Sequence, residues 1–513
     1  MLQIKNLNIT HKKDLRVILK DFSCVFNDGD KAVLIGEEGN GKSTLLKWIY
    51  DEKLVNDYCE TEGELVKTKE RLAYLPQELP TEKRKMSVCE FFMEEERFLE
   101  QTPKELGKLA KEFHVPADFF YREQCMETLS GGEKVKAQMM RLMLTEPTVL
   151  LLDEPSNDID VETLEWLEQL IVNWPHIVLF ISHDETLIEN TANMIIHIEQ
   201  IKRKTVCRYT ISHGSYLNYK EERNRDFKNK ERQAESERRQ KKIREEKLKR
   251  IYQSVDYAQE TISRQDPAGG RLLKKKMHVV KAMEHRFERE DATMTEMPEQ
   301  ESAIFFKLGE NQTAIPNGKT IIEYENPKLQ TPDGTRLLAK NLFLRVKGSE
   351  KICITGKNGT GKTTLLHELA DELLQRTDIN VQYMPQNYEE LLNLEMTPVE
   401  YLDTSGEKEE QTKIRTFLGA LKYTADEMSH PICQLSGGQK AKIFLLKMSM
   451  SGANVLILDE PTRNFSPLSG PVIRRMLKEF PGAILSISHD RKYMEEVCDK
   501  IYYLDEDGLH LKE

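Results

Sequence analysis

The stretch IGEEGNGKSTLL, residues 35–46, places glycines, a lysine and two hydroxyl side chains between an apolar run and a leucine-rich segment. The preceding run, KAVLI, predicts a buried strand, and the following TLL predicts the start of a helix. Glycines in such a loop let backbone N–H groups close around phosphate oxygens, and the helix N-terminus adds positive potential. The stretch therefore predicts a phosphate-binding loop at the carboxyl end of a strand.

The same stretch returns as TGKNGTGKTTLL at residues 355–366, so the chain contains an internal repeat. Three further motifs recur in the same order: LSGG, an apolar run that ends in Asp-Glu, and SHD. Their matching residues are 306 positions apart, in the pairs Ser130 and Ser436, Glu154 and Glu460, and His183 and His489. The lysines of the two loops, Lys42 and Lys362, are 320 positions apart. The repeat predicts two domains of the same architecture.

Each half carries the residue types that bind and hydrolyse a nucleoside triphosphate. Lys42 and Lys362 are expected to reach the β and γ phosphates, while the hydroxyls of Ser43 and Thr363 face Mg²⁺. VLLLDE and VLILDE predict buried strands that deliver carboxylates to the edge where α/β sheets bind ligands. The expected roles are Mg²⁺ binding for Asp153 and Asp459, orientation and deprotonation of water for Glu154 and Glu460, and contact with the γ phosphate for His183 and His489. A lone histidine at a strand end is more often a packing residue, but the identical spacing of SHD in both halves favours function.

The phosphate-binding loops, LSGG, DEP and SHD together resemble the ATP-binding cassette (ABC) family over nearly all of residues 1–215 and 320–513. The resemblance implies an ATPase that uses ATP and Mg²⁺, with two cassettes paired head to tail. It implies that Lys42 shares one ATP site with Ser436 and Gly438, and that Lys362 shares the other with Ser130 and Gly132. The implied nucleotide contacts are Gly36, Gly39, Asn40, Gly41, Lys42, Ser43, Thr44, Ser130, Gly131, Gly132, Gly356, Gly359, Thr360, Gly361, Lys362, Thr363, Thr364, Ser436, Gly437 and Gly438. The implied Mg²⁺ ligands are Ser43, Gln77, Asp153, Thr363, Gln386 and Asp459, and Gln77 and Gln386 are also implied in catalysis.

The predicted fold class is α/β, with two tandem ABC-type P-loop ATPase domains joined by a long α-helical hairpin linker. The predicted domains are residues 1–215 for the first cassette, 216–305 for the linker with its tip near 250–270, and 306–513 for the second cassette. A thin apolar spacing of seven residues supports the hairpin, with Phe227, Ala234 and Leu248 in one arm and Leu273, Val280 and Phe287 in the other. About 30 residues per arm would span roughly 45 Å. Pro267, Gly269 and Gly270 are expected to break the helical pattern at the tip.

The predicted linker is basic although the whole chain is acidic. Residues 220–290 contain 22 Lys or Arg and 14 Asp or Glu, whereas the chain has a net charge of −11. Because a basic segment attracts an RNA backbone, we expect phosphates of ribosomal RNA or tRNA to contact Arg271, Lys274, Lys275, Lys276 and Lys281. A solvated coiled coil that acts only as a spacer is the alternative. The expected tip comprises Tyr252, Gln253, Ser254, Val255, Asp256 and Tyr257, whose two tyrosines would either stack on bases or close the hairpin.

Two cassettes on one chain without membrane spans resemble the ABC-F branch, whose members act on ribosomes. Within that branch, DEPTRNFSPLSGPVIRRM resembles the antibiotic-resistance class of Gram-positive bacteria, with Ser466 where the family pattern has Asp. The resemblance implies a protein that enters the 70S ribosome at the tRNA exit site and contacts 23S rRNA and P-site tRNA. It would protect the peptidyl-transferase centre from pleuromutilins, lincosamides and streptogramin A compounds, and ATP hydrolysis would release it.

Two features depart from the family pattern. The aromatic residue that stacks on adenine has no counterpart in ITHKKD or LQTPDG, where His11 is a weak substitute. In the D-loop that follows DEP, the first half keeps Asp160, whereas the second half has Ser466 where the family pattern has Asp. The two ATP sites are therefore expected to differ.

Other functions remain open on the sequence: a housekeeping ABC-F factor that relieves stalled ribosomes, and, in a different class, the ATPase subunit of a membrane transporter. A DNA-repair ATPase would require a longer coiled coil or zinc-binding cysteines, and the eight cysteines are scattered without a CxxC pair. No apolar run reaches the roughly 18 residues of a membrane span, and MLQIKNLNIT lacks the pattern of a signal peptide. We therefore expect a cytoplasmic protein with no membrane or DNA partner, monomeric, with its cassettes paired within the chain.

Overall fold

The computed structural model describes residues 1–201, 205–261, 267–292, 318–332 and 334–512, together with residues 294, 295, 297, 308, 315 and 316. The chain divides into two compact units. One consists of Met1–Tyr216 with Glu301–Glu513 and contains both cassettes, and the other is Leu217–Gln300. The predicted fold class is confirmed: two α/β domains of the same architecture flank a pair of long helices in the sequence.

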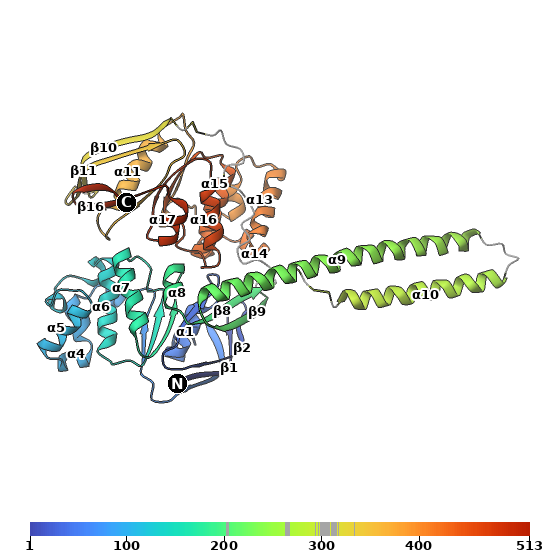
Figure 1. The fold of residues 1–513 in the computed structure, drawn as a ribbon, viewed down its shortest axis with the longest axis horizontal. Coiled ribbons are helices and arrows are strands. Elements are labelled where there is room, and N and C mark those ends of the chain that lie inside the picture. The colour runs from blue at the N-terminus through green and yellow to red at the C-terminus, as the bar shows by residue number, and fades with distance from the viewer. Residues whose placement is uncertain are drawn as a thin grey trace. The chain divides into compact units, whose positions relative to one another are not determined.

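A six-stranded sheet forms the centre of the first cassette, in the order β5-β6-β7-β3-β8-β9 (Figure 1). Its strands are β3 (Lys31–Ile35), β5 (Leu72–Leu75), β6 (Val149–Asp153), β7 (Ile177–Ile181), β8 (Met194–Ile201) and β9 (Val206–His213). Only β8 and β9 pair antiparallel within this sheet. The strands β3, β6 and β7 are buried along their whole length, which explains their unbroken apolar runs. A second, antiparallel sheet has the order β2-β1-β4 and consists of β1 (Leu2–His11), β2 (Val17–Phe26) and β4 (Cys59–Lys67).

The helices of the first cassette connect these strands. They are α1 (Lys42–Tyr50), α2 (Thr81–Arg84), α3 (Val88–Met93), α4 (Glu96–Glu100), α5 (Pro103–Glu112), α6 (Gly131–Met143), α7 (Val161–Asn173) and α8 (Glu185–Thr191), with short 3-10 turns at Glu52–Leu54, Phe119–Tyr121 and Met126–Thr128. The loop between β3 and α1 is the predicted phosphate-binding loop. LSGG spans the start of α6, whose first turn is closed by a capping box between Ser130 and Glu133.

The second cassette repeats this plan. Its central sheet has the order β13-β14-β15-β12-β16-β17, with strands β12 (Lys351–Thr355), β13 (Val381–Met384), β14 (Val455–Asp459), β15 (Ala483–Ile487), β16 (Lys500–Asp505) and β17 (Gly508–Lys512). A two-stranded sheet pairs β10 (Thr320–Gln330) with β11 (Leu337–Lys347). The helices are α11 (Lys362–Leu374), α12 (Pro398–Leu402), α13 (Lys408–Ala420), α14 (Ala425–Ser429), α15 (Gly437–Met450), α16 (Gly470–Lys478) and α17 (Arg491–Val497), with 3-10 turns at Tyr388–Glu390 and Ile432–Gln434.

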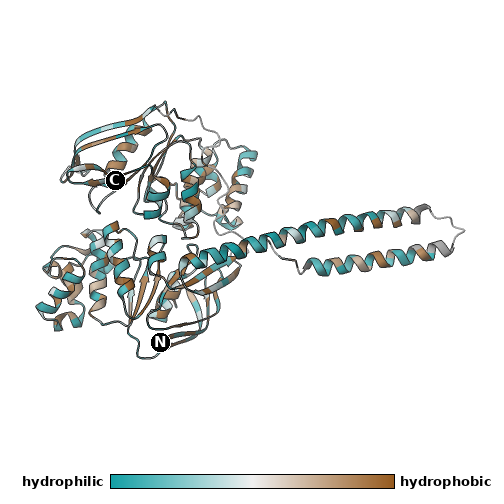
Figure 2. Ribbon diagram, viewed as in Figure 1, coloured by the Kyte–Doolittle hydropathy of each residue, from teal (hydrophilic) through white to brown (hydrophobic). Residues whose placement is uncertain are grey.

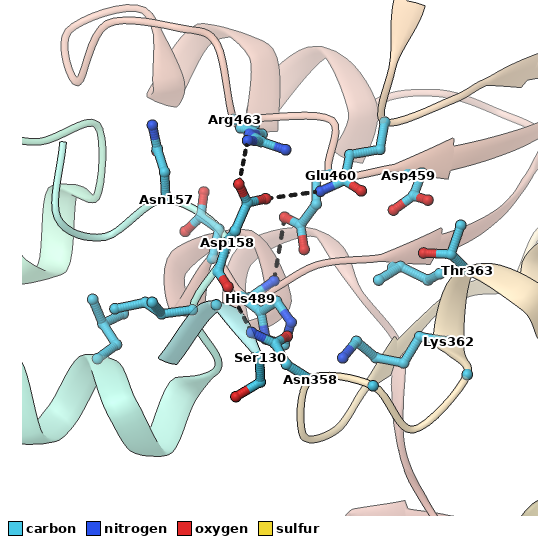
Figure 3. A pocket seen from close by; sticks show the side chains of 18 of the residues that line it. Ser130, Asn157, Asp158, Asn358, Lys362, Thr363, Asp459, Glu460, Arg463 and His489 are labelled. Atoms are coloured by element: carbon cyan, nitrogen blue, oxygen red, sulfur yellow. Dashed lines mark hydrogen bonds and ion pairs between the residues drawn. The ribbon is translucent and has the colours of Figure 1, made fainter. Parts of the chain in front are cut away.

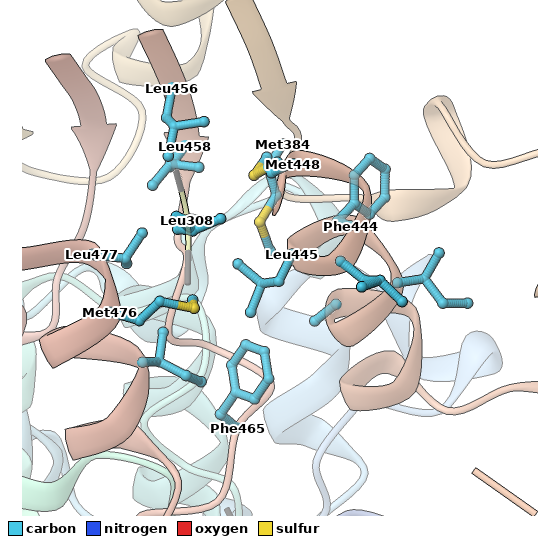
Figure 4. Packing of buried hydrophobic residues seen from close by; sticks show 14 of the residues in the cluster. Leu308, Met384, Phe444, Leu445, Met448, Leu456, Leu458, Phe465, Met476 and Leu477 are labelled. Carbon is cyan, nitrogen blue, oxygen red and sulfur yellow. The ribbon is translucent and has the colours of Figure 1, made fainter. Parts of the chain in front are cut away.

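Two apolar cores cover the faces of the second central sheet, because successive strand residues point to opposite sides. Leu456 and Leu458 of β14 belong to the core that packs on α15 and α16, drawn in Figure 4. Val455 and Ile457 belong to the core that packs on α11 and on β10 and β11. In the first cassette, one core joins both sheets to α1. These cores hold the carboxyl ends of the central strands, where the predicted catalytic residues lie.

The second unit is a pair of helices, α9 (Tyr216–Thr261, 46 residues) and α10 (Pro267–Ala292, 26 residues). Figure 2 shows that both are largely hydrophilic, in contrast to the central strands of the cassettes. Of the predicted seam residues, Ala234 and Val280 are buried, Phe227, Leu248 and Phe287 are partly buried, and the side chain of Leu273 lies outside the described part of the structure. Ion pairs join the two helices, with Lys241 Nζ 3.0 Å from Asp291 and Arg244 paired with Glu290. At 1.5 Å per residue, α9 is about 70 Å long, so the arms are unequal and the first is longer than expected.

The expected break at the tip is partly wrong. The six residues from Tyr252 to Tyr257 lie within α9, and α10 begins at Pro267 and includes Gly269 and Gly270. Proline is well tolerated at the first position of a helix, because its missing N–H would have no helical partner there. Two glycines weaken a helix without ending it when the rest of the segment favours the helix. The sequence between the two helices, residues 262–266, lies outside the described residues.

Among the described residues, no helix combines the length and the apolar character that crossing a membrane would require.

Two neighbouring valines of α10 allow a test of the predicted apolar seam between α9 and α10. Val280 is 3% exposed and Val279 is 57% exposed. We expect Val280→Ala to lower the free energy of opening of α9 and α10 by about 1–2 kcal/mol, because it removes two buried carbon atoms and leaves a gap. Val279→Ala should be neutral or stabilising by about 0.5 kcal/mol, since alanine favours a helix more than valine does. Native-state hydrogen exchange of the amides in both helices measures the difference, and equal effects of the two substitutions would contradict the seam.

Candidate functional site

Both phosphate-binding loops have the same local geometry. Lys42 Nζ donates to the carbonyl oxygens of Gly36 (2.8 Å) and Glu37 (3.1 Å). Lys362 Nζ does the same toward Gly356 (2.9 Å) and Lys357 (2.8 Å). Both lysines are buried, and burial lowers the pKa of Lys362. Each ammonium group is therefore held inside its loop at the N-terminus of α1 or α11, in the place that the sequence predicts for phosphate binding.

A close backbone contact fixes each loop against its sheet. A side chain at Gly36 would meet the carbonyl oxygen of Ile198 at 2.2 Å, and one at Gly356 would meet that of Leu504 at 2.5 Å. Both glycines also adopt positive φ, at 143° and 155°. Only glycine combines this backbone conformation with such an approach. The first glycine of each motif therefore anchors the loop and does not line a cavity.

The strand-end carboxylates lie beside the loop hydroxyls. Ser43 Oγ donates to Asp153 Oδ1 at 2.9 Å, and the Tyr74 hydroxyl donates to the other oxygen of the same carboxylate at 3.1 Å. In the second cassette, burial raises the pKa of Asp459 to about 6, and a hydrogen bond from Thr363 opposes that rise. Asp459 Oδ2 is buried and has no hydrogen-bond partner among the described residues. Each pair supplies oxygen donors of the kind that hard divalent cations prefer.

The described residues contain no group of three or more His, Cys, Asp and Glu side chains that would form a dense metal cage. Mg²⁺ sites at bound phosphates commonly use only one or two protein carboxylates, so hydroxyl–carboxylate pairs remain suitable.

Glu154 and Glu460 follow the two buried strands in the left-handed region, with φ of 51° and 50°. Their backbone N–H groups donate to Ile181 (3.1 Å) and Ile487 (3.0 Å), which are the ends of the neighbouring strands. Residues other than glycine rarely adopt this conformation, and such strain concentrates at functional sites. The same turn thus presents a glutamate at the same place in both cassettes.

The surroundings of the two glutamates differ. His183 Nε2 lies 2.8 Å from Glu154 Oε1, and His183 Nδ1 lies 2.7 Å from the carbonyl oxygen of Phe465 in the second cassette. Both ring nitrogens of His183 therefore face oxygen atoms that can accept a hydrogen bond. Although burial raises the pKa of Glu154, the charge and hydrogen bond of His183 outweigh it and lower the pKa overall.

At the second glutamate the histidine is neutral. Burial lowers the pKa of His489 to about 4, and nearby Lys362 adds to this shift. His489 Nδ1 is buried without a hydrogen-bond partner among the described residues. Burial and the neighbouring Asp459 raise the pKa of Glu460 to about 8. Identical motifs therefore produce an ionised glutamate in one cassette and a protonated one at neutral pH in the other.

The larger of the two cavities that contain a phosphate-binding lysine, of about 550 Å³, is lined from both cassettes (Figure 3). The sequence-predicted residues that line it are Ser130, Gly131, His183, Gly359, Gly361, Lys362, Thr363, Thr364, Gln386, Asp459, Glu460 and His489. Asn358 Nδ2 donates to the carbonyl oxygen of Asp158 at 2.6 Å and joins the second loop to the first cassette. Gln386 Nε2 donates to Asp158 Oδ1 at 3.2 Å. LSGG of the first cassette thus faces the phosphate-binding loop of the second.

The smaller cavity, of about 290 Å³, contains the first loop. The sequence-predicted residues that line it are Gly39, Gly41, Lys42, Ser43, Thr44, Gln77, Glu154 and His183. The second cassette contributes Arg463 and Asn464 to its wall. Ser436 and Gly438 instead line a separate cavity of about 30 Å³.

The carboxylate of Glu38 lies between these two cavities and lines both. The backbone N–H of Gly438 donates to it, so an acidic side chain from the first loop occupies the N-terminus of α15. The equivalent residue in the second loop is the neutral Asn358. The acidic side chain of Glu38 therefore distinguishes the first loop from the second.

Six predicted nucleotide contacts line none of these three cavities: Gly36, Asn40, Gly132, Gly356, Thr360 and Gly437. Most have structural contacts of their own. Asn40 Nδ2 donates to Ile198 at 3.1 Å, and Thr360 Oγ1 donates to Lys357 at 2.9 Å. A side chain on Gly132 would lie 2.6 Å from Thr163 Oγ1, so this glycine is needed for helix packing.

Three arginines in the cavities were missed by the sequence analysis. Arg16 lines the first cavity and Arg336 the second, at the places where an adenine-stacking aromatic residue was sought. They are 320 positions apart, the same offset as Lys42 and Lys362, and this shared offset is the signal that would have found them. Arg463 lines both cavities and binds Asp158 at 2.9 Å, a contact between cassettes that no local motif indicates.

The predicted RNA-binding residues lie on α10. The side chains of Arg271, Lys274, Lys275, Lys276 and Lys281 are all exposed. Of the proposed tip residues, Tyr252 and Tyr257 are 41% and 70% exposed, whereas Val255 is buried.

Comparisons with known proteins agree with this architecture. The family model described as ABC transporter matches residues 19–157 and 339–463. Ribosome protection protein VmlR of Bacillus subtilis (strain 168) is 27% identical over 514 residues, which cover 98% of this chain and 86% of that protein. ABC transporter F family member 5 of Arabidopsis thaliana is 25% identical over 548 residues, which cover 96% of this chain and 73% of that protein.

The crystal structure of the complex of archaeal ribosomal stalk protein aP1 and archaeal ribosome recycling factor aABCE1 is similar in fold, with a TM-score of 0.59 at 17% identity. The match covers 97% of this chain and 87% of the solved chain. The family model alone covers more than half of the 513 residues. The chain therefore belongs to the ABC transporter family, in its ABC-F branch, and its two cassettes are ATP-binding ATPase domains.

Proposed function

We propose that ATP binds in the two cavities between the cassettes and is hydrolysed there by equivalent sets of residues. Lys42 and Lys362 neutralise the β and γ phosphates, and LSGG of the opposite cassette closes on the γ phosphate through the helix N-termini at Ser130 and Ser436. The observation that supports this proposal is the larger cavity, whose wall combines Ser130 of one cassette with Lys362 of the other.

Within each site, the strand-end glutamate, Glu154 or Glu460, orients the attacking water and, in its ionised form, accepts the water's proton. His183 and His489 hold the γ phosphate. Mg²⁺, held by Ser43 with Asp153 and Gln77, and by Thr363 with Asp459 and Gln386, supplies charge neutralisation on the phosphates. The partnerless oxygen of Asp459 and the Ser43–Asp153 contact fit such an ion.

We infer that the whole protein is a ribosome-binding factor. The charge of the helical pair supports ribosome binding, because α10 presents five exposed basic side chains although the whole chain carries a net charge of −11. Such a segment binds a phosphate backbone by releasing condensed counterions. Ribosome protection protein VmlR, similar along 98% of this chain, gives independent support.

The finer proposal is protection of the peptidyl-transferase centre from antibiotics. The closed, ATP-bound cassettes would fix the helical pair for entry at the tRNA exit site of the 70S ribosome, beside 23S rRNA and P-site tRNA, and hydrolysis would release the protein. ATP drives such a change only to the extent that it binds the closed state more tightly than the open one. Pleuromutilins, lincosamides and streptogramin A compounds are the drugs that we propose first.

The first test uses Glu154→Gln with Glu460→Gln, which keeps the cavities but removes both water-orienting carboxylates. We expect ATP hydrolysis to fall by about 100-fold or more, and ATP to trap this variant on 70S ribosomes in a pelleting assay. Lys42→Ala with Lys362→Ala is the control, because it weakens phosphate binding and should leave the protein in the supernatant. Cryo-EM of the trapped complex would then place residues 252–257 relative to the peptidyl-transferase centre.

Each outcome of that experiment has a separate meaning. Trapping with the helical pair near the peptidyl-transferase centre, together with loss of resistance in cells that carry the variant, supports drug protection. Trapping without any effect on drug susceptibility supports a factor for stalled ribosomes. If the variant stays in the supernatant with ATP, the ribosome proposal is wrong.

The second test reverses charge on α10. We expect Lys274→Glu, Lys275→Glu and Lys276→Glu together to weaken ribosome binding and to make its salt dependence shallower by about two to three units of slope, because three phosphate contacts are lost. The matched control reverses Lys104, Lys108 and Lys111, three exposed lysines of α5 in the first cassette. Ribosome pelleting between 50 and 300 mM salt, on the order of the range where counterion release dominates, measures both slopes. Equal slopes for the two triple variants would argue against binding through α10.

The third test concerns the acidic side chain in the first loop. We expect Glu38→Gln to tighten ATP binding at the first site by about fivefold, roughly 1 kcal/mol, because it removes a partly screened negative charge from the place of the γ phosphate. ADP, which lacks that phosphate, should bind with little change. Titration of a fluorescent ATP analogue onto the Lys362→Ala protein isolates this site. The reciprocal change, Asn358→Asp in the Lys42→Ala protein, should weaken ATP at the second site, and unchanged affinity in both would contradict the role of this charge.

A further inference from the structure

Opposite charges stand at equivalent positions of the two cassettes. The helix pairs α7 and α8 in the first cassette and α16 and α17 in the second share the 306-residue offset of the catalytic motifs. Glu168 on α7 corresponds to Arg474 on α16, and Glu185 on α8 corresponds to Arg491 on α17. At both positions the first cassette is acidic and the second is basic.

These residues meet between the cassettes in two matching pairs. Arg474 Nη2 lies 2.8 Å from Glu185 Oε2, and each side chain is only 3% exposed. Arg491 Nη2 lies 2.9 Å from Glu168 Oε2, with exposures of 21% and 20%. The two contacts are related by the repeat, since each joins the α7 or α16 position of one cassette to the α8 or α17 position of the other.

Neighbouring ion pairs between the cassettes also have the acidic residue in the first cassette and the basic residue in the second. Lys492 of α17 lies 3.5 Å from Glu185 and also pairs with Glu189 of α8. Arg491 lies 3.7 Å from Asp184 of the first cassette. Within its own cassette, Arg474 also binds Glu496 through Nε at 2.8 Å. In each of these ion pairs between the cassettes, the acid lies on α7, on α8 or at Asp184 just before α8, and the base lies on α16 or α17.

This arrangement discriminates between partners. If two first cassettes met through the same pseudo-twofold geometry, Glu168 would face Glu185 twice, and two second cassettes would bring Arg474 against Arg491 twice. A buried charge that meets a like charge loses both its solvation and its partner, so such pairs are strongly unfavourable. Discrimination by a repulsive contact against the wrong partner is as effective as an attractive contact with the right one.

We propose that Glu168, Glu185, Arg474 and Arg491 determine which cassettes pair: a first cassette accepts only a second cassette, and like cassettes of different chains are rejected. Pairing then stays within one chain, because the covalent connection gives the correct partner a high effective concentration. These four side chains join the cassettes through contacts in which no nucleotide-binding residue takes part. They specify the pairing that both ATP cavities require.

The test uses two charge-reversed full-length chains. The acidic variant carries Arg474→Glu and Arg491→Glu, and the basic variant carries Glu168→Arg and Glu185→Arg. Each by itself should lose ATP hydrolysis by about tenfold or more, because like charges now separate the cassettes. Mixed in equal amounts, the two variants should form a two-chain complex with twice the 59.7 kDa mass of one chain, and ATP hydrolysis should return. Mass photometry and phosphate release measure these results without any ribosome, so failure here is distinct from failure of the ribosome proposal.

The fourfold variant, with all four charges exchanged, should behave as the unmodified chain: a single-chain mass and ATP hydrolysis within about twofold. If it is as impaired as the two double variants, or if either double variant hydrolyses ATP normally, the proposal is overturned. Formation of a two-chain complex by either variant with the unmodified chain, as readily as with its complement, would also overturn it.

A second pair of variants avoids the deeply buried Arg474, whose loss of contact with Glu496 could itself unfold the second cassette. At the partly exposed pair, Glu168→Arg and Arg491→Glu should each lower ATP hydrolysis. The two substitutions together should restore ATP hydrolysis. The control is Glu350→Lys with Lys500→Glu, an ion pair of 2.7 Å within the second cassette that should leave mass and hydrolysis unchanged. No recovery in the Glu168–Arg491 exchange, with circular dichroism showing folded protein, would contradict the proposal independently.

Discussion

The approach of a glycine backbone to a neighbouring strand, Gly36 against Ile198 and Gly356 against Leu504, is the constraint on which both ATP sites depend. A loop held at that distance must turn directly into a helix, so Lys42 and Lys362 become the first helical residues. The central strands then bring Asp153 and Asp459 to the same edge, beside Ser43 and Thr363. Chemistry at this edge needs no unusual side chain, because backbone N–H groups, a lysine and a carboxylate already match a triphosphate.

Duplication has produced two sites with the same motifs and different electrostatics. Glu154 is ionised beside His183, whereas Glu460 is buried beside Asp459 and holds its proton to about pH 8 in this state of the protein. The histidines differ as well: the Phe465 carbonyl of the opposite cassette contacts His183 Nδ1, and His489 Nδ1 has no hydrogen-bond partner among the described residues. Glu38 adds an acidic group to the first site where the second has Asn358. Each site is therefore tuned by residues outside its own motifs.

Interaction between the cassettes rests on charge as well as on shape. Arg463 joins Asp158 and lines both cavities, which places one guanidinium group between the two sites. The Glu–Arg pairs on α7, α8, α16 and α17 have the same polarity at both ends of the repeat. A symmetric interface between identical cassettes does not permit such polarity, since both cassettes would then carry the same charge at these positions and two first cassettes would bring Glu168 against Glu185. Because the two cassettes on one chain differ in sequence, their facing surfaces can carry charges of opposite sign.

The sequence by itself determined the structural elements that follow from a local motif or from a periodic pattern of apolar residues. The glycine-rich loops, the buried strands that end in Asp-Glu and the LSGG helix starts follow from backbone conformation and apolar runs, and the 306-residue offset established the duplication. A thin apolar seam and a high charge were enough to predict two long helices, although Gly269 and Gly270, which were expected to break the helical pattern, lie in the first turn of α10.

Only the tertiary structure decided which side chains meet across the two cassettes. Arg16, Arg336 and Arg463 enter the cavities, Glu38 reaches the N-terminus of α15, and Glu185 meets Arg474 289 positions away. Protonation at Glu154 and Glu460 also depends on this packing, because burial and neighbouring charges change a pKa through space. A local motif specifies which groups a cassette presents, whereas contacts between distant segments specify the environment in which those groups react.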